Sequence, residues 1–194
     1  MNRQRLRLAA VAALPAATLV LGGLSLWALN GAGEARLAGV PLMKLAAGYS
    51  RTAERLLASP APSVDALDRA RSLTRAGLRE YPYDASGWLR LAYADAERHG
   101  SLTPEAIEYL RRSYTLVEAD IYAGVWRIAF ILEHTGAVPK DLRQSAKKET
   151  ALLWRENSKR RELSERISAV QNPAGRLSGL LWLRRAQDVA VREF

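Results

Sequence analysis

The chain of 194 residues is long enough for one ordinary domain, or for a small domain and a membrane segment. Its 48% hydrophobic and 25% charged residues exclude both an intrinsically disordered chain and a protein buried wholly in a membrane. The formal net charge is +9, the absence of cysteine excludes disulfides, thiolate catalysis and cysteine-based zinc sites, and two histidines are too few for a multi-histidine metal site.

The first thirty residues have the pattern of a membrane segment. Residues 8–29 carry no charge and would form a helix of about 33 Å, long enough for the roughly 30 Å core of a bilayer. Arginines precede this run and no acidic residue occurs before Glu34, which holds the N-terminus in the cytoplasm by the positive-inside rule. We therefore predict cytoplasmic arginines and a transmembrane helix or signal anchor over residues 1–30, then a linker over 31–41. A cleaved secretory signal is the alternative.

Beyond the linker, the sequence predicts an all-α protein. Strand signals are nearly absent after residue 40, whereas apolar residues recur three or four positions apart. Residues typical of helix starts and ends mark the boundaries: Ser63, Asp84, Gly100, Thr103-Pro104, Gly136, Pro139 and Asn172-Pro173. Because the connections are short, we expect an antiparallel array of helix hairpins.

An internal repeat relates two of these helical segments. Three pairs of residues are each 38 positions apart: Leu78 and Leu116, Ala85 and Ala123, and Trp88 and Trp126. The spacing Leu78-x3-Pro82-x2-Ala85-x2-Trp88-x2-Leu91 resembles the tetratricopeptide repeat. The likeness covers residues 64–135, about two repeats, and the second copy has Asp120 in place of the proline. It implies a tetratricopeptide-like solenoid over 42–138, with the flanking helices as caps.

The resemblance also implies a concave groove lined by the first helix of each pair. Counted from the two tryptophans, Tyr93, Arg127 and His134 would face this groove and contact a peptide. Arginine can hold a carboxylate through two hydrogen bonds, which suits an extended segment or a chain terminus. The alternative is that Tyr93, like Ile131, packs between helices.

The C-terminal region, residues 139–194, is expected to form a long basic helix followed by a capping helix. Its basic patch consists of Arg155, Lys159, Arg160, Arg161 and Arg166, which could attract an anionic glycan, an anionic lipid or an acidic partner. The alternative for this run is a solvated helix supported by its own salt bridges. The last helix has a wide apolar surface that either packs on a partner or folds back as the final cap.

No catalytic motif accompanies these helices. The chain lacks a glycine-rich phosphate loop, the zinc-protease and serine-hydrolase motifs and an acidic calcium loop, so we expect no enzyme, no metal and no cofactor. The composition is typical of bacteria. The leading hypothesis is a non-catalytic, single-pass inner-membrane scaffold or accessory subunit whose periplasmic domain binds other proteins of an envelope complex, with polysaccharide synthesis or export as its setting. The alternative is a binder of anionic glycan or lipid through residues 155–166; the membrane segment disfavours nucleic acid.

Overall fold

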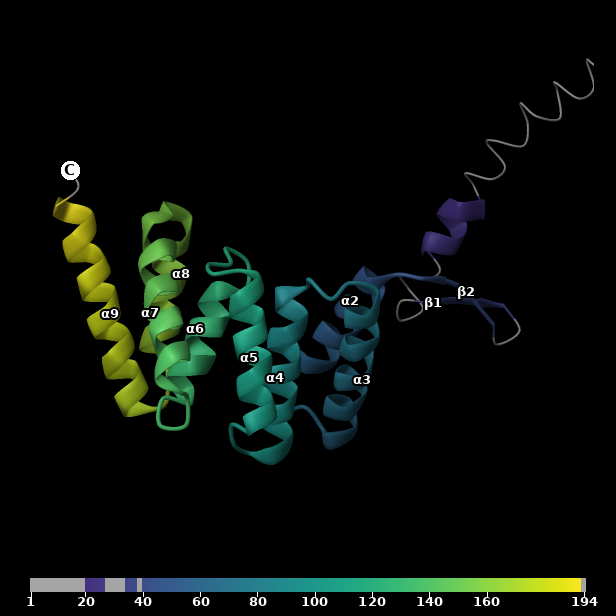
Figure 1. Cartoon of the computed structure of the whole chain (residues 1–194), viewed down its shortest axis with the longest axis horizontal. Coiled ribbons are helices and arrows are strands. Elements are labelled where there is room, and N and C mark those ends of the chain that lie inside the picture. Colours follow the sequence, from purple (N-terminus) through teal and green to yellow (C-terminus); the bar gives the residue numbers. More distant parts are fainter. Residues whose placement is uncertain (1–19, 27–33, 38–39, 193–194) are drawn as a thin grey trace, which may run out of the picture. The chain divides into compact units, whose positions relative to one another are not determined.

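The computed structural model describes residues 20–26, 34–37 and 40–192, and Figure 1 shows the arrangement of their elements. The predicted membrane segment lies mostly outside these residues, and only residues 20–26 of it are described, as a short helix. Within the described ranges, we find no helix with both the length and the hydropathy required to cross a bilayer. The membrane anchor stays a prediction, since most of its residues lie outside those described.

A short β-hairpin occupies most of the predicted linker and the first residues, 42–44, of the region predicted as helical repeats. Strands β1 (Glu34–Leu37) and β2 (Val40–Lys44) pair antiparallel, with Leu37 opposite Val40. Pro41 within β2 is a residue that argues against a central strand, but the described sheet has only two strands and each is therefore an edge. The sequence pattern of these residues did not predict that the two segments pair as strands.

The rest of the described chain is helical, which confirms the predicted helical fold, and it divides into two compact units between Pro82 and Tyr83. In the first unit, α2 (Ala46–Leu57) and α3 (Val64–Glu80) lie side by side (Figure 1). Gly77 permits this close approach, because a Cβ there would lie 3.3 Å from the Cβ of Tyr49. The pair buries Tyr49, Ala53, Leu67, Ala70 and Leu78.

The second unit holds the remaining described helices: α4 (Ala85–His99), α5 (Pro104–Leu116), α6 (Gly124–Glu133), α7 (Lys140–Arg155), α8 (Asn157–Ser168) and α9 (Pro173–Arg192). Helix α4 pairs with α5, whereas α6 packs against α7, α8 and α9. One apolar core runs through this unit, with Leu110, Ile128, Ile131, Leu142 and Ile167 among its fully buried members. Helix α6 is central, because it supplies the longest run of buried residues.

Cap geometry confirms several predicted helix boundaries. The side-chain oxygens of Ser63, Thr103 and Asn172 each accept a hydrogen bond from the backbone amide three residues later, at 3.2, 3.0 and 3.1 Å respectively. Gly100 ends α4 with a φ of 63°, the left-handed conformation that glycine adopts most readily. Asp84 precedes α4 as predicted, but its carboxylate makes an ion pair and not a cap hydrogen bond.

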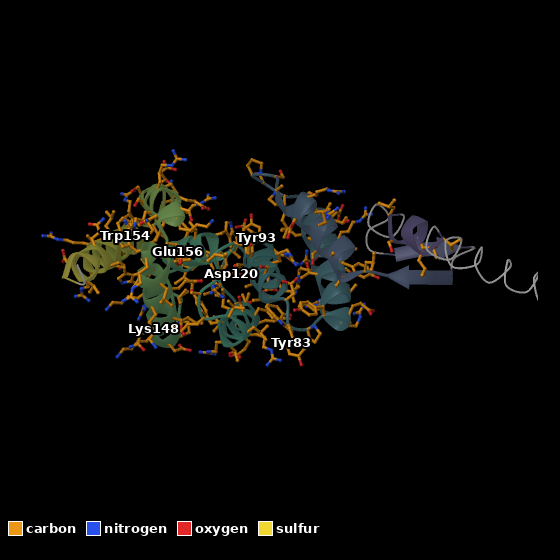
Figure 2. All side chains as sticks on the ribbon, turned by 90° about the horizontal axis from the view of Figure 1, so that it is seen from above. Tyr83, Tyr93, Asp120, Lys148, Trp154 and Glu156 are labelled. Carbon is orange, nitrogen blue, oxygen red and sulfur yellow. The ribbon has the colours of Figure 1, made fainter. Side chains whose placement is uncertain are left out.

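The long basic helix predicted from residue 139 onward is in fact two helices, α7 and α8. Glu156 separates them, with an extended backbone at φ −81° and ψ 102°. Arg160 closes the turn, since its Nε donates a hydrogen bond to the backbone oxygen of Trp154 at 2.7 Å and so satisfies a carbonyl at the end of α7. Figure 2 labels Trp154 and Glu156 at this corner. Helix α8 then packs against α6 and α7 and buries Leu163.

Helix α9 folds back on α6, α7 and α8, which is one of the two alternatives that its sequence left open. Two glycines one turn apart make the approach to α6 possible. A Cβ on Gly175 would overlap the carbonyl oxygen of Leu132, and a Cβ on Gly179 would lie 2.7 Å from the Cδ1 of Leu132. Leu177 and Leu181 stay exposed. The capping helix therefore covers the core with one face only.

Candidate functional site

A hollow of about 330 Å³ opens in the second unit between α4, α6 and the end of α8. Four rings and three charged groups characterise its lining. These residues, which we call the aromatic hollow, are Tyr93, Trp126, Phe130, His134, Glu97, Glu133 and Arg166. The hollow therefore combines an apolar floor with a charged margin, as ligand sites in proteins commonly do.

The rings of the hollow pack on one another. Trp126 and Phe130 of α6 and its C-cap residue His134 follow one another at intervals of four residues, which places them on one side of the helix. The Trp126 and Phe130 rings stack with centroids 5.4 Å apart, and Tyr93 of α4 meets Trp126 edge to face at 5.1 Å. The His134 ring meets Phe130 at 4.7 Å. These contacts restrain each ring before any ligand binds. Binding of a ligand would therefore cost little conformational entropy of these side chains.

Of the three charged side chains at the margin, one carboxylate accepts hydrogen bonds from the protein backbone, and the other two side chains form no ion pair among the described residues. Glu133 accepts hydrogen bonds from the backbone amides of Gln171 and Asn172, at 2.7 and 2.9 Å, and so fixes the connection between α8 and α9. Glu97 and Arg166 are exposed, and neither side chain forms an ion pair within the part of the chain that the structure describes. The margin thus offers one anion and one cation to a ligand.

Burial alters the titration of two groups in the hollow. Burial, and next the nearby Glu97 carboxylate, raise the pKa of Tyr93, so its hydroxyl keeps its proton as a hydrogen-bond donor. Burial lowers the pKa of His134, and the carboxylates of Glu97 and Glu133 oppose this effect only in part. His134 is therefore favoured in its neutral form and adds to the floor more than to the charge of the site.

The structure brings together three residues that the sequence assigned to two different sites. Tyr93 and His134 were predicted for the peptide groove and both line the hollow. Arg166 was predicted for the basic patch, yet it lines the same hollow from the end of α8. Tyr93 also fits the packing alternative in part, since it is half-buried against Trp126, whereas Ile131 is fully buried in the core.

The prediction that Arg127 contacts a peptide is wrong, because its side chain is only 1% exposed. It forms an ion pair with Glu149 of α7, which is completely buried. The Arg127 Nε donates to Glu149 Oε2 at 3.0 Å, and its Nη1 donates to the hydroxyl of Ser113 at 3.0 Å. Its Nη2 donates to the carbonyl oxygen of Val117 at 3.1 Å. Each nitrogen of the guanidinium therefore has a partner inside the protein.

Neighbouring residues explain why the fold tolerates these buried charges. The Tyr114 hydroxyl and the backbone amide of Asp120 also donate to Glu149, at 2.8 and 3.0 Å, and the Arg127 guanidinium lies 3.8 Å from the Tyr114 ring centroid. Burial, followed by the Glu149 charge, raises the pKa of Tyr114 well above its usual value. Gly124 leaves room for the carboxylate, since a Cβ there would lie 2.5 Å from Glu149 Oε1. This cluster ties α5, α6 and α7 together.

The other members of the predicted basic patch are dispersed. Lys159 pairs with Glu162 at 2.9 Å, and Arg161 pairs weakly with Glu165 at 3.8 Å. Arg160 donates to Trp154 and lies over its ring, 5.5 Å from the centroid. Arg155 is exposed at the end of α7. Binding of an anion by residues 155–166 stays a prediction, and these contacts fit the alternative of a solvated helix with internal salt bridges.

Sequence reasoning missed Trp126, Phe130 and Glu97 as members of the site. It used Trp126 only to align the repeats. The spacing of Trp126, Phe130 and His134 by four residues is a signal that could have identified an aromatic face on one helix. Glu97 likewise follows Tyr93 by four residues.

Comparison with protein-family models, with curated proteins and with solved structures found no match for this chain. The tetratricopeptide-like character of residues 64–135 stays a prediction.

Proposed function

We propose that the chain is a non-catalytic, membrane-anchored scaffold or accessory subunit that binds another protein of a bacterial envelope complex, and that a segment of this partner docks in the aromatic hollow. The observation that carries the proposal is the convergence of four packed rings and two charged side chains from three helices.

The chemistry of the hollow favours an extended peptide segment. Its volume accommodates one or two large side chains, which would stack on Trp126 and Phe130. Arg166 can bind a carboxylate of the segment through two hydrogen bonds, and Glu97 can pair with a lysine or an arginine. Rings that bind an apolar anchor, surrounded by charges that orient it, are typical of the centre of a protein interface.

The arrangement of the helices supports a repeat-type groove. Helices α4 and α6 begin the two predicted repeats, and both line the hollow. A tetratricopeptide-like solenoid would place the first helix of each repeat on its concave face, as the resemblance in residues 64–135 implies. A third helix, α8, adds Arg166 to the same surface.

The proposed anchor would strengthen a weak contact. A hollow of this size makes few contacts, so its affinity for a free segment is expected to be low. If residues 1–30 hold the chain in the inner membrane with its helical domain in the periplasm, a membrane-bound partner is kept at high local concentration. Fusion of a periplasm-specific and a cytoplasm-specific reporter enzyme to the C-terminus tests this topology: only the first should be active, and activity of the second alone contradicts the anchor's orientation.

Site-specific crosslinking tests the docking site. A photoreactive phenylalanine analogue is placed at Tyr93 or, as a matched control, at Tyr122, which is 86% exposed in the same unit but does not line the hollow. In native membranes the Tyr93 position should crosslink to one defined protein, and the Tyr122 position should not. Equal crosslinking from both positions, or none from Tyr93, would overturn the proposal.

A further inference from the structure

A second hollow, of about 300 Å³, lies between α7 and α9 and shares no residue with the aromatic hollow. Its lining includes three cations of α7 and the half-buried ring of Trp182 from α9. The cations are Lys140, Arg143 and Lys147. These three cations are three or four residues apart, which places them on one face of α7.

An adjoining hollow extends this surface along α7. It shares Gln144 and Lys147 with the hollow between α7 and α9 and adds Lys148 and Ala151. Positions 140, 143, 144, 147, 148 and 151 follow the spacing of a single helix face, about 16 Å long at 1.5 Å per residue. Lys148 lies on this exposed face (Figure 2). We call Lys140, Arg143, Lys147, Lys148 and Trp182 the cationic stripe.

No carboxylate among the described residues lines either hollow of the stripe. Both acidic residues of α7 are engaged elsewhere. Asp141 accepts a hydrogen bond from the Nε of Arg111 at 2.9 Å, and Glu149 is buried with Arg127. The positive charge of the stripe is therefore not compensated by its own helix. Neighbouring like charges repel one another, so an anionic ligand would relieve this repulsion.

The uncharged polar side chains that line the same hollow as the stripe limit which kind of anionic ligand fits there. The hydroxyls of Thr135 and Ser178 donate to backbone oxygens of their own helical turns, at 2.8 Å each, so toward a ligand they act as acceptors. Gln144 offers an amide that both donates and accepts. A matching ligand carries hydroxyl donors beside its negative charges and has an apolar face for Trp182. Sugar rings with acidic substituents have all three features.

We propose that the cationic stripe binds a linear acidic polysaccharide, with its acidic groups on the lysines and Arg143 and one ring on Trp182. The elongated shape favours a polymer over a single small anion. Trp182 lines the hollow and is half-buried, so it can stack on a sugar ring that enters the hollow, whereas a lipid headgroup stays at the bilayer surface. This site is independent of the aromatic hollow, and a protein partner is not required for it.

The test is calorimetric titration of the full chain, in mild detergent, with a linear oligogalacturonate. Parallel titrations use a neutral maltooligosaccharide of the same length, a single-stranded oligonucleotide of the same charge, and phosphatidylglycerol in the micelle. We expect the oligogalacturonate to bind with an affinity that falls as salt rises, because exposed charges are screened. The neutral sugar should not bind, and the oligonucleotide and the lipid should bind more weakly than the uronate.

Variants with matched charge assign the binding to the stripe. Lys140→Ala with Lys147→Ala removes two exposed cations of α7, and Arg69→Ala with Arg79→Ala removes two exposed cations of α3 as a control for net charge. The α7 pair should weaken binding about tenfold and the α3 pair less than twofold. Trp182→Phe should weaken binding by a few-fold while circular dichroism stays unchanged, and Tyr93→Ala should have no effect.

Several outcomes would overturn the proposal. Equal weakening by the two charge pairs would mean that only the net charge of the chain attracts the uronate. Tighter binding of the oligonucleotide or the lipid through the α7 lysines would assign the stripe to that ligand class. Binding of no anionic probe would remove the site altogether.

Discussion

Two adjacent residues of α6, Trp126 and Arg127, lie in opposite environments. Arg127 is enclosed in the core with Glu149, whereas Trp126 next to it lines an open hollow with Phe130 and His134. General tendencies would place the charged residue outside and the aromatic residues inside. The reversal separates the roles of the helix faces: the buried charge holds helices together, and the open aromatic face is free to meet a partner.

The largest expected effect concerns the buried ion pair. Arg127→Ala leaves the Glu149 carboxylate buried without its main partner, and we expect a loss of about 3 to 5 kcal/mol in the free energy of unfolding. Replacing both residues, as Arg127→Met with Glu149→Leu, should recover much of this loss, because no buried charge is left. Urea unfolding followed by circular dichroism measures both. A loss below about 1 kcal/mol for the single variant would mean that water reaches the pair.

The second prediction concerns the face of α6 that receives α9. Gly175→Ala places a methyl group on the carbonyl oxygen of Leu132, so α9 must shift away, at a cost of about 1 to 3 kcal/mol. Gly136→Ala is the matched control, since a Cβ there meets nothing within 4 Å. Thermal unfolding should give a lower melting temperature for Gly175→Ala than for Gly136→Ala. Equal melting temperatures would contradict the close packing of α9 on α6.

The third prediction concerns the open face. Tyr93→Ala removes a ring from the lining of the aromatic hollow and should weaken binding of the crosslinked partner's segment about tenfold. Tyr122→Ala, at a more exposed tyrosine outside the hollow, should leave the Kd unchanged. Fluorescence anisotropy of the labelled segment gives both values. The docking assignment fails if the two variants behave alike while both remain folded.

The smallest effect is a dependence of stability on pH. Because burial lowers the pKa of His134 in the folded chain, the unfolded chain binds more protons at mildly acidic pH, and stability rises with pH through this range. The contribution is complete above the pKa of an unfolded histidine and is lost as the pH falls toward the folded value. Melting temperatures at pH 5 and pH 8 should differ less in His134→Gln than in the parent chain. An unchanged difference would show that His134 is solvated like a free histidine.

Local features of the sequence predicted much of the helical framework. Ser63, Thr103 and Asn172 cap helices as expected, because a cap depends on residues within one turn. Gly100 ends α4 for the same local reason. The hairpin of β1 and β2 was missed, since its short strands include a proline and depend on pairing with each other.

The errors at the site have a non-local cause. Whether Arg127 faces a groove or the core depends on Glu149, which is distant in the sequence and belongs to a helix whose own end was misplaced. Arg166 joined the aromatic hollow only because the chain turns back at Glu156. Periodicity can assign a residue to a face of its helix, but it cannot say what lies opposite that face.

The indole signals of Trp126 and Trp182 in a nitrogen-15 NMR spectrum of the full chain test the central claim most directly, because these rings lie in the two separate hollows. Addition of the partner segment identified by crosslinking at Tyr93 should shift the Trp126 signal and leave that of Trp182 in place. A stationary Trp126 signal with saturating segment, or a shift confined to Trp182, would contradict the assignment of the aromatic hollow as the docking site.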